Sequence, residues 1–159
     1  MYSNYYCNDY KLRMNTKSEV GNRLLQFGVK PSLQRIAIME YLMAHLTHPT
    51  ADVIFNDLYP SIPTLSKTTV YNTLKLLEDQ GAIRAVSIDD KNLRYDADIS
   101  NHAHFKCKQC GNVQDIPLKD GAGFEIINTG DFLLMELQIY YKGYCRQCKD
   151  VFTQNTNRV

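Results

Sequence analysis

Two Cys-x-x-Cys pairs constrain the folding of this chain more than any other feature of its sequence. Cys107/Cys110 and Cys145/Cys148 bring four thiol groups from two separate segments. Four thiolates are the ligand set of a tetrahedral structural Zn²⁺ site. The alternative, a redox-active dithiol, requires one exposed reactive pair rather than two separated pairs. The pattern therefore predicts a four-cysteine zinc site that joins the two segments and stabilises the fold.

The composition is that of a globular protein: of 159 residues, 44% are hydrophobic and 22% are charged. No apolar run reaches the roughly 18 residues that a membrane-spanning helix needs, so we expect no membrane association. The first residues are polar and rich in tyrosine, unlike a signal peptide. We therefore expect a cytoplasmic protein, in which paired cysteines bind metal rather than form disulfides. We assign no role to Cys7, the fifth cysteine.

Residues 18–80 have the apolar spacing of helices, with start and stop signals between them. Gly28 and Gly81 are expected to end the first and the last helix. Pro31-Ser32 opens the second helix, and Thr50 and Ser66 are expected N-caps of the third and fourth. The pattern predicts helices over 18–27, 32–46, 50–59 and 67–80.

Two short strands are expected next, at 82–88 and 93–95, joined by an Asp-Asp-Lys-Asn turn. Helices followed by a β-hairpin are typical of the winged helix, in which the fourth helix here would enter the major groove of DNA. Beyond residue 96 the sequence predicts strands at 102–107, 112–116 and 132–142. A helix between 118 and 129 is weakened by Gly121 and Gly123.

The start of the fourth helix carries residues suited to a DNA groove. Lys67 can reach phosphates, Asn72 can pair with adenine, and Thr68, Thr69 and Tyr71 offer contacts to bases. An exposed polar helix without ligand is the alternative. The net charge of +1 decides nothing here, so any DNA-binding surface depends on local placement of Lys and Arg.

A His-x-His sequence, His102 and His104, precedes the first cysteine pair. On a strand, both side chains point the same way and can bind one ion. Asp96 and Asp115 are the nearest suitable carboxylates, with Asp98 as a competing choice for Asp96. Imidazoles and carboxylates suit Fe²⁺, Mn²⁺ or Zn²⁺. A solvated or purely structural His pair is the alternative, but the adjacent cysteine knuckle favours a metal site.

His48 lies far upstream, between the second and third predicted helices. If the same ion recruits His48 as well as Asp96, it connects the helical part of the chain to the β-rich part. Metal occupancy would then set the angle between the two parts.

Taken in order, these residues resemble the ferric uptake regulator (Fur) superfamily over about Gly21 to Cys148. The resemblance is carried by residues 28–35, 48–52, 68–72, 94–96, 102–111 and 145–148. It implies an α+β fold, with an N-terminal winged-helix DNA-binding domain followed by a small α/β dimerisation domain that contains the four-cysteine zinc site. The expected division is a flexible extension at 1–17, a winged helix at 18–95, a hinge near 89–99, and a metal-binding dimerisation domain at 96–159.

Within the family the chain looks most like the peroxide-sensing, PerR-like branch. Both carboxylates of the regulatory site are Asp, where iron-uptake regulators typically have Glu, and Asn72 replaces their usual Arg. The resemblance implies Fe²⁺ or Mn²⁺ as the regulatory metal beside structural Zn²⁺. The regulatory ligands fall on His48, Asp96, His102, His104 and Asp115.

The implied function is transcriptional repression without enzymatic activity. The homodimer binds a palindromic operator in double-stranded DNA when the regulatory metal is present, with Lys30 and Tyr71 among the DNA contacts. Peroxide then causes an iron-catalysed oxidation of His48 or His102, which weakens metal binding and releases the DNA. The alternatives are an iron- or zinc-level sensor within the family, a non-haem iron enzyme, and a purely structural zinc-ribbon domain.

Overall fold

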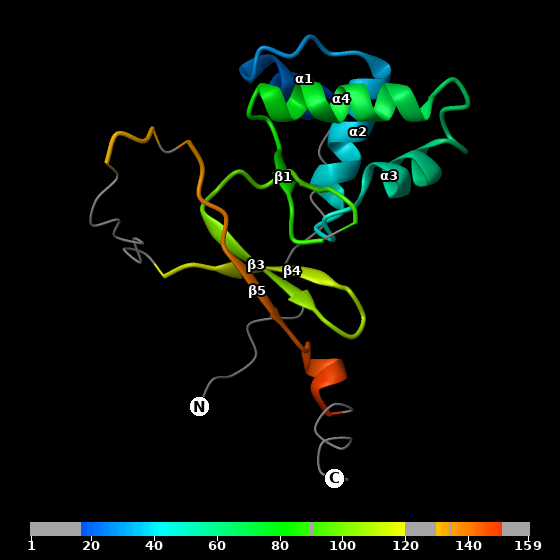
Figure 1. Ribbon diagram of the computed structural model, residues 1–159. Helices are drawn as coiled ribbons and strands as arrows, with labels where there is room; N and C mark the ends of the chain where they lie inside the picture. The colour runs from blue at the N-terminus through cyan, green and yellow to red at the C-terminus, as the bar shows by residue number, and fades with distance from the viewer. Residues whose placement is uncertain (1–16, 90, 120–129, 134, 151–159) are drawn as a thin grey trace.

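The chain folds into a helical lobe and a smaller β lobe, with a two-stranded wing between them (Figure 1). The structure is a computed structural model that describes residues 17–89, 91–119, 130–133 and 135–150. The helices are α1 (Lys17–Gln26), α2 (Leu33–Ala44), α3 (Ala51–Leu58) and α4 (Lys67–Asp79). The strands are β1 (Arg84–Val86), β2 (Arg94–Asp96), β3 (His102–Cys107), β4 (Val113–Pro117) and β5 (Tyr140–Gly143).

The helix starts follow from side-chain caps. Ser32, Thr50 and Ser66 are the N-cap residues of α2, α3 and α4, as expected for Thr50 and Ser66, and each side-chain oxygen accepts a backbone N–H three residues later. Such a cap satisfies one of the unpaired donors at the start of a helix. After α1, Gly28 adopts a φ of 72°, and the next amide, of Val29, donates to the Leu24 carbonyl. This left-handed turn lets α1 end where α2 can pack back against it.

The helical lobe encloses the main hydrophobic core. Side chains from all four helices are fully buried in it, among them Leu24, Ile38, Leu42, Ile54 and Leu74. The outer face of α4 remains exposed, because the apolar positions of that helix recur only on its inner side. The core thus presents the polar start of α4 to solvent.

The wing is an antiparallel pair, β1 with β2, as the sequence predicts. The loop before α3 packs along the wing: Thr50 forms a bridge with Arg94, and the Tyr95 amide donates to the Pro49 carbonyl at 3.1 Å. This pairing brings His48, next to Pro49, beside the end of β2. A second small core of Val86, Ile88 and Val113, with Tyr140 packed against it, joins the wing to the β lobe.

The β lobe is a three-stranded sheet in the order β4-β3-β5. β3 pairs with β4 in antiparallel fashion and with β5 in parallel fashion, so β3 is the central strand. The predicted pairing of 102–107 with 112–116 is confirmed, with His104 opposite Asp115. His104 is therefore paired with strands on both sides, whereas His102 is paired with β4 alone.

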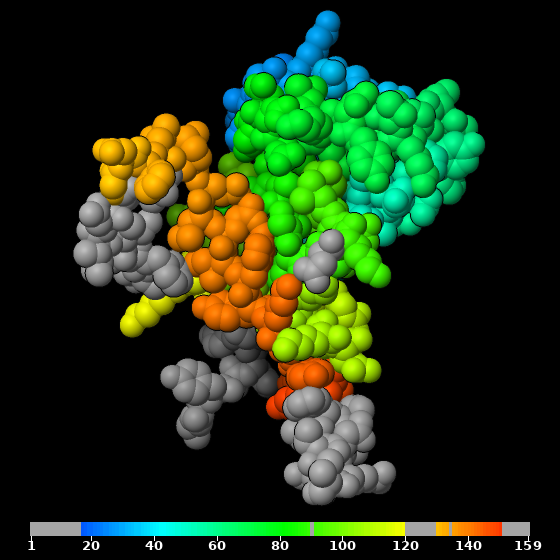
Figure 2. Space-filling view, viewed as in Figure 1, coloured from blue at the N-terminus to red at the C-terminus, as the bar shows by residue number. Residues whose placement is uncertain are grey.

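One strand prediction is wrong in its extent. The alternation over 132–142 yields only β5, and residues 132, 133 and 135–139 are not in strand. Phe132, Leu133, Met135 and Leu137 are 61–84% exposed, and this light-orange segment projects from the side of the molecule (Figure 2). Alternation predicts a strand only where a neighbouring edge accepts its hydrogen bonds. In this segment the Ile139 carbonyl accepts from the His104 amide at 2.9 Å, but residues 132, 133 and 135–138 pair with no strand in the described part of the chain.

Residues 1–16 and 120–129, which include most of the predicted extension and of the weak helix, lie outside the described residues. Lys17 is the first residue of α1. Among the helices that the structure describes, none combines the length and apolar character needed to cross a bilayer.

Candidate metal centres

Five side chains from both lobes converge at the junction of wing and sheet. His48 comes from the loop before α3, Asp96 from the end of β2, His102 and His104 from β3, and Asp115 from β4. One donor atom of each lies within 4.8 Å of all the others. The residues that the resemblance assigns to the regulatory metal are therefore neighbours in the fold. Asp98, the competing choice for Asp96, is exposed and outside this cluster.

The contacts within the cluster run between imidazole Nε2 atoms and carboxylate oxygens. His48 Nε2 lies 2.8 Å from Asp115 Oδ1, and His102 Nε2 lies 3.0 Å from Asp96 Oδ2. His104 Nε2 lies between, 3.5 Å from Asp96 Oδ2 and 3.7 Å from Asp115 Oδ1. The Nε2 atoms of His102 and His104 are 3.1 Å apart. All three imidazoles thus direct the same ring nitrogen at the same two oxygens.

The cluster is deeply buried, and several of its polar atoms lack hydrogen-bond partners. His48 is 1% exposed, and Asp96 and His104 are 4% exposed. His48 Nε2, Asp96 Oδ2 and Asp115 Oδ1 have no partner with hydrogen-bond geometry, despite their short separations. Unsatisfied buried polar groups are costly, unless a further group is bound among them. A divalent cation with mixed nitrogen and oxygen ligands fits this arrangement.

The charges in the cluster also fit a bound divalent cation. Burial opposes protonation of His48, but the carboxylates of Asp115 and Asp96 outweigh it and raise the pKa of His48 to about 9. The adjacent Asp96 carboxylate, 3.0 Å from His102 Nε2, likewise raises the pKa of His102. Burial disfavours the Asp96 carboxylate, yet the surrounding imidazoles hold the pKa of Asp96 well below its usual range. Protons thus compensate the carboxylates at neutral pH, and a bound cation would displace them.

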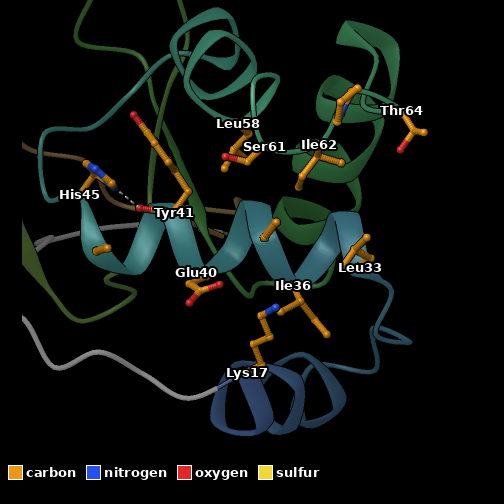
Figure 3. Close-up of a pocket in the computed structure, with 13 residues that line it drawn as sticks. Lys17, Leu33, Ile36, Glu40, Tyr41, His45, Leu58, Ser61, Ile62 and Thr64 are labelled. Atoms are coloured by element: carbon orange, nitrogen blue, oxygen red, sulfur yellow. Dashed lines mark hydrogen bonds between the residues drawn. The ribbon is translucent and has the colours of Figure 1, made fainter.

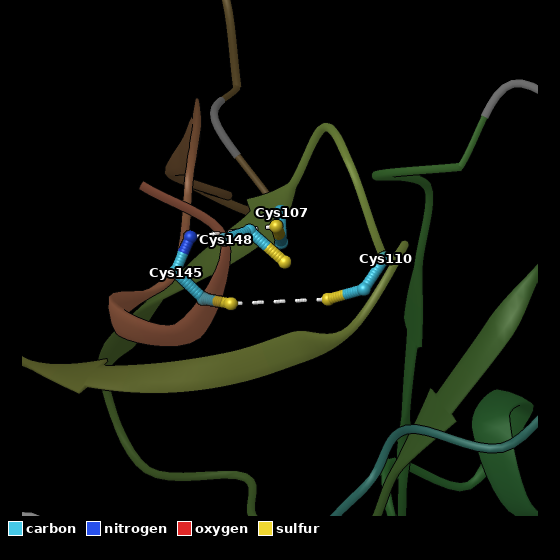
Figure 4. A group of neighbouring side chains, drawn as sticks. All are labelled: Cys107, Cys110, Cys145 and Cys148. Atoms are coloured by element: carbon cyan, nitrogen blue, oxygen red, sulfur yellow. Dashed lines mark hydrogen bonds between the residues drawn. The ribbon is translucent and has the colours of Figure 1, made fainter. Parts of the chain in front are cut away.

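The four cysteines form a second cluster at the far end of β3 (Figure 4). Their sulfur atoms all lie within 4.8 Å of one another, and Cys110 Sγ is 3.9 Å from Cys145 Sγ. Cys107 is buried at the end of β3, while the other three are partly or fully exposed. Four thiols at these separations fit a tetrahedral Zn²⁺ site.

Backbone N–H groups prepare this second cluster for thiolates. The Cys110 backbone amide, with those of Cys145 and Gln109, lowers the pKa of the Cys107 thiol to about 6. Hydrogen bonding to Cys145 and burial raise the pKa of Cys148 to about 12, because neighbouring sulfurs compete for negative charge. A bound Zn²⁺ would remove that competition and hold all four groups as thiolates.

One basic residue near the cysteines has a different partner from the one that the sequence suggests. Its place beside Cys107 suggests that Lys106 offsets the negative charge of a zinc–thiolate site. Its Nζ instead donates to Asp89 Oδ1 at 3.1 Å, across the lobe junction. Sequence inspection could not find this contact, because the partners lie on different elements.

The fourth histidine of the chain, His45, is not part of either cluster. It lines an apolar groove of about 560 Å³ beside α2, with its Nδ1 2.8 Å from the Tyr41 carbonyl (Figure 3). Tyr41 donates to Asp57 at 2.5 Å, and the His45 ring stacks on Tyr41. These contacts account for His45 structurally, as part of the α2 surface.

The residues expected to contact DNA share one exposed face. Lys67, Thr68, Tyr71 and Asn72 are exposed on the first turns of α4, and Thr69 is half-buried. Lys67 is paired with Asp52 at 2.7 Å. A polar hollow of about 380 Å³ lies between α4 and the loop before α2, lined by Lys30, Arg35, Thr69 and Asn72 among others. Arg35, which donates to the Lys30 carbonyl, is a basic residue of this face that the sequence analysis missed.

Known proteins match both the sequence and the fold. The sequence profile of the Ferric uptake regulator family matches residues 26–141. The Peroxide-responsive repressor PerR of Staphylococcus aureus (strain USA300) is 35% identical over 129 residues, covering 80% of this chain and 87% of the relative.

Two solved structures share the fold. That of the Helicobacter pylori ferric uptake regulator Fur, described as having three functional metal binding sites, aligns with a TM-score of 0.66 and 21% identity, covering 86% of this chain and 96% of that one. That of the Francisella tularensis ferric uptake regulator with iron aligns with a TM-score of 0.63 and 22% identity, covering 77% and 96%. On the profile match and the identity to its relatives, this chain belongs to the ferric uptake regulator family.

Proposed function

We propose that this chain is a metal-dependent DNA-binding repressor whose regulatory ion sits among His48, Asp96, His102, His104 and Asp115. The observation that carries the proposal is the convergence of five donors from both lobes within 4.8 Å. An ion bound there would link the loop before α3 and the wing to the sheet, and so favour one arrangement of the lobes. Binding that differs between two arrangements shifts the population toward the better-bound one.

The DNA-binding surface is proposed to be the exposed start of α4 with the adjoining loop before α2. Thr68, Thr69, Tyr71 and Asn72 face outward there and would read base edges. Lys67 and Lys30 would contact phosphates, and Lys67 would exchange its surface pairing with Asp52 for one with DNA. Because the net charge is only +1, DNA binding would depend on basic residues placed on this surface rather than on the overall charge of the protein.

The four cysteines are proposed to hold a structural Zn²⁺. This ion would join the end of β3 to the segment after β5, which carries Cys145 and Cys148. The chemistry that it supplies is structural, because four sulfur ligands leave no open coordination position.

The signal is proposed to be peroxide, as in the relatives that are 35% identical. Fe²⁺ held by these five residues would supply redox catalysis, which Mn²⁺ supplies poorly. The peroxide would oxidise the imidazole of His48 or His102 by two electrons: the ring would gain one oxygen atom, and the other oxygen would leave as water. An oxidised ring is a poor ligand, so the lobes separate and the DNA is released. No observation favours a sensor of iron or zinc level over a sensor of peroxide.

The protein is proposed to act as a homodimer on a palindromic operator, in the cytoplasm and without enzymatic turnover. The exposed apolar side chains before β5 support this, together with β5 itself as an edge strand. Phe132, Leu133, Met135 and Leu137 are each more than half exposed, and large exposed apolar surfaces often mark protein–protein contacts. A two-fold dimer presents two α4 helices, which suits an operator with two half-sites.

The decisive experiment measures DNA binding with and without regulatory metal. A binding site is first selected from a random duplex library with Mn²⁺-loaded protein. Fluorescence anisotropy should then show tight binding with Mn²⁺, and binding weaker by at least about tenfold with His102→Ala or after removal of Mn²⁺, as expected for a coupling of roughly 1–3 kcal/mol. Equal binding with and without metal would refute the proposal.

A further inference from the structure

Three charged residues outside the metal cluster form an ionic bridge between the wing and the β lobe. Asp89 lies in the wing turn, Arg94 begins β2, and Lys106 lies on β3. Asp89 Oδ1 accepts from Lys106 Nζ at 3.1 Å, and Asp89 Oδ2 accepts from Arg94 Nη2 at 3.1 Å and from Arg94 Nε at 3.3 Å. All three side chains are only 19–20% exposed, so solvent screens the bridge incompletely.

The bridge continues to a proposed metal ligand. Arg94 Nη1 donates to the His48 carbonyl at 3.1 Å. His48 has a φ of 52°, the left-handed conformation that costs a residue with a Cβ free energy, and it precedes a proline that disfavours this region further. Such strained residues persist only when their surroundings hold them. Arg94, supported by Asp89, is one contact that holds the His48 peptide in this conformation.

The other end of the bridge lies on the strand that carries two more ligands. His102, His104 and Lys106 alternate along β3, so their side chains leave the same face of the strand. The two histidines contact Asp96, and His104 also packs edge-on against His48. The Lys106–Asp89 ion pair adds a further contact from this face to the wing, and this contact does not depend on a metal ion.

We propose that Asp89, Arg94 and Lys106 form an interlobe clamp. These positioning residues hold the His48 side chain close to β3 before the metal binds, and they thereby raise the affinity for the regulatory metal. This inference rests on the proposed function, since it assumes a metal among the five donors. Residues that orient metal ligands typically change metal affinity by about 10–100-fold when removed. Lys106 is next to Cys107, so the clamp, the cysteine cluster and the five-donor cluster all have members on β3.

The test is a Mn²⁺ titration of the full-length protein with its zinc retained, by calorimetry or electron paramagnetic resonance. Asp89→Asn and Arg94→Lys should raise the dissociation constant for Mn²⁺ roughly tenfold, and Lys106→Gln should raise it several-fold. Because the residues act as a unit, the Asp89→Asn/Lys106→Gln double variant should lose little more than Asp89→Asn alone. Lys106→Arg should keep most of the affinity.

Lys108→Gln is the matched control. Lys108 is the exposed residue on the other side of Cys107 in the sequence, and its substitution removes the same positive charge as Lys106→Gln. It should leave the Mn²⁺ affinity unchanged. A second measurement needs no regulatory metal: in metal-free protein, hydrogen exchange of the Tyr95 amide, which donates to the Pro49 carbonyl, should speed up in Asp89→Asn and Arg94→Lys but not in Lys108→Gln.

The outcomes separate this inference from the proposed function. Wild-type protein that takes up no Mn²⁺ at the five donors would overturn both. Wild-type uptake with unchanged affinity and unchanged Tyr95 exchange in the Asp89 and Arg94 variants would overturn the clamp alone. A merely structural role would lower the resistance to urea without changing the Mn²⁺ affinity, and this result too would overturn the clamp.

Discussion

The Nε2 atom of His48 lies 2.8 Å from Asp115 Oδ1, although His48 precedes α3 and Asp115 lies on β4 of the other lobe. This contact is what makes the five-donor cluster a property of both lobes. Had His48 lain elsewhere, the remaining donors would all belong to the wing end and the sheet. A bound ion would then not connect the sheet to the helical lobe, which carries α4, and could hardly affect its position.

Substitution of Cys107 or Cys148 by Ser should remove the zinc and unfold the β lobe. The cluster connects β3 to the segment after β5, and structural zinc sites contribute roughly 10 kcal/mol or more of binding free energy to folding. Elemental analysis after mild chelation should show one zinc per wild-type protomer and none in the variants. Cys7→Ser is the control and should keep its zinc. A folded, zinc-free dimer of Cys107→Ser would contradict the assignment.

Peroxide at micromolar concentration should add the mass of one oxygen atom to the iron-loaded protein but not to the manganese-loaded protein. His48 and His102 are the expected positions, since their Nε2 atoms contact Asp115 and Asp96 at the centre of the cluster. Mass spectrometry of proteolytic peptides identifies the modified residue, and His45, outside the cluster, is the internal control. DNA release without modification of either ring would refute peroxide sensing through a ligand.

Mn²⁺ affinity should rise with pH between about 7 and 8.5. In metal-free protein the carboxylates of Asp115 and Asp96 raise the pKa of His48 to about 9, against the effect of burial, so His48 holds a proton throughout this range. Metal needs the neutral imidazole, so binding releases this proton, and the affinity increases by up to about tenfold per pH unit for each proton released. Calorimetry in two buffers of different ionisation enthalpy counts the protons. A pH-independent affinity would show that His48 is not a ligand.

Asn72→Ala and Lys30→Ala should weaken DNA binding in different ways. Loss of a base contact at Asn72 should cost about 1–3 kcal/mol of binding free energy and relax the specificity at one base pair. Loss of a phosphate contact at Lys30 should instead weaken binding to all DNA sequences alike, and it should lower the slope of log affinity against log salt concentration by about 1. Anisotropy titrations at several salt concentrations distinguish the two effects. Lys108→Ala, on the β lobe, should change neither. Wild-type affinity in both variants would place the DNA elsewhere.

A charge on the exposed apolar segment should dissociate the dimer. Leu133 and Met135 are 84% and 83% exposed, so Leu133→Glu or Met135→Glu costs the monomer little, but it would bury a carboxylate in the proposed interface. Light scattering after size exclusion should show monomers and weakened operator binding. Val53→Glu, at an exposed apolar position on α3, is the control and should remain dimeric. Dimeric Leu133→Glu and Met135→Glu would exclude this face.

Much of the fold was predictable because its signals are local. The caps Thr50 and Ser66, the wing pair and the β3–β4 pairing depend on residues close in sequence, and the structure confirms each. The cysteine cluster was predictable for a related reason, since each Cys-x-x-Cys turn has a geometry of its own. The spacing of His102 and His104 on a strand indicated a metal site, whereas the complete set of five ligands came from the family resemblance.

Tertiary contacts decided the rest. They selected Asp96 over Asp98 and brought His48 beside Asp115 through a left-handed turn that local preferences disfavour. They paired Lys106 with Asp89 rather than with the cysteine cluster, and they left most of the segment before β5 without a strand neighbour, against its alternation. Sequence alone determined where α3 and α4 begin, because a helix cap depends on neighbours along the chain. The shared ion site depends on elements whose separation in space only the packed lobes set.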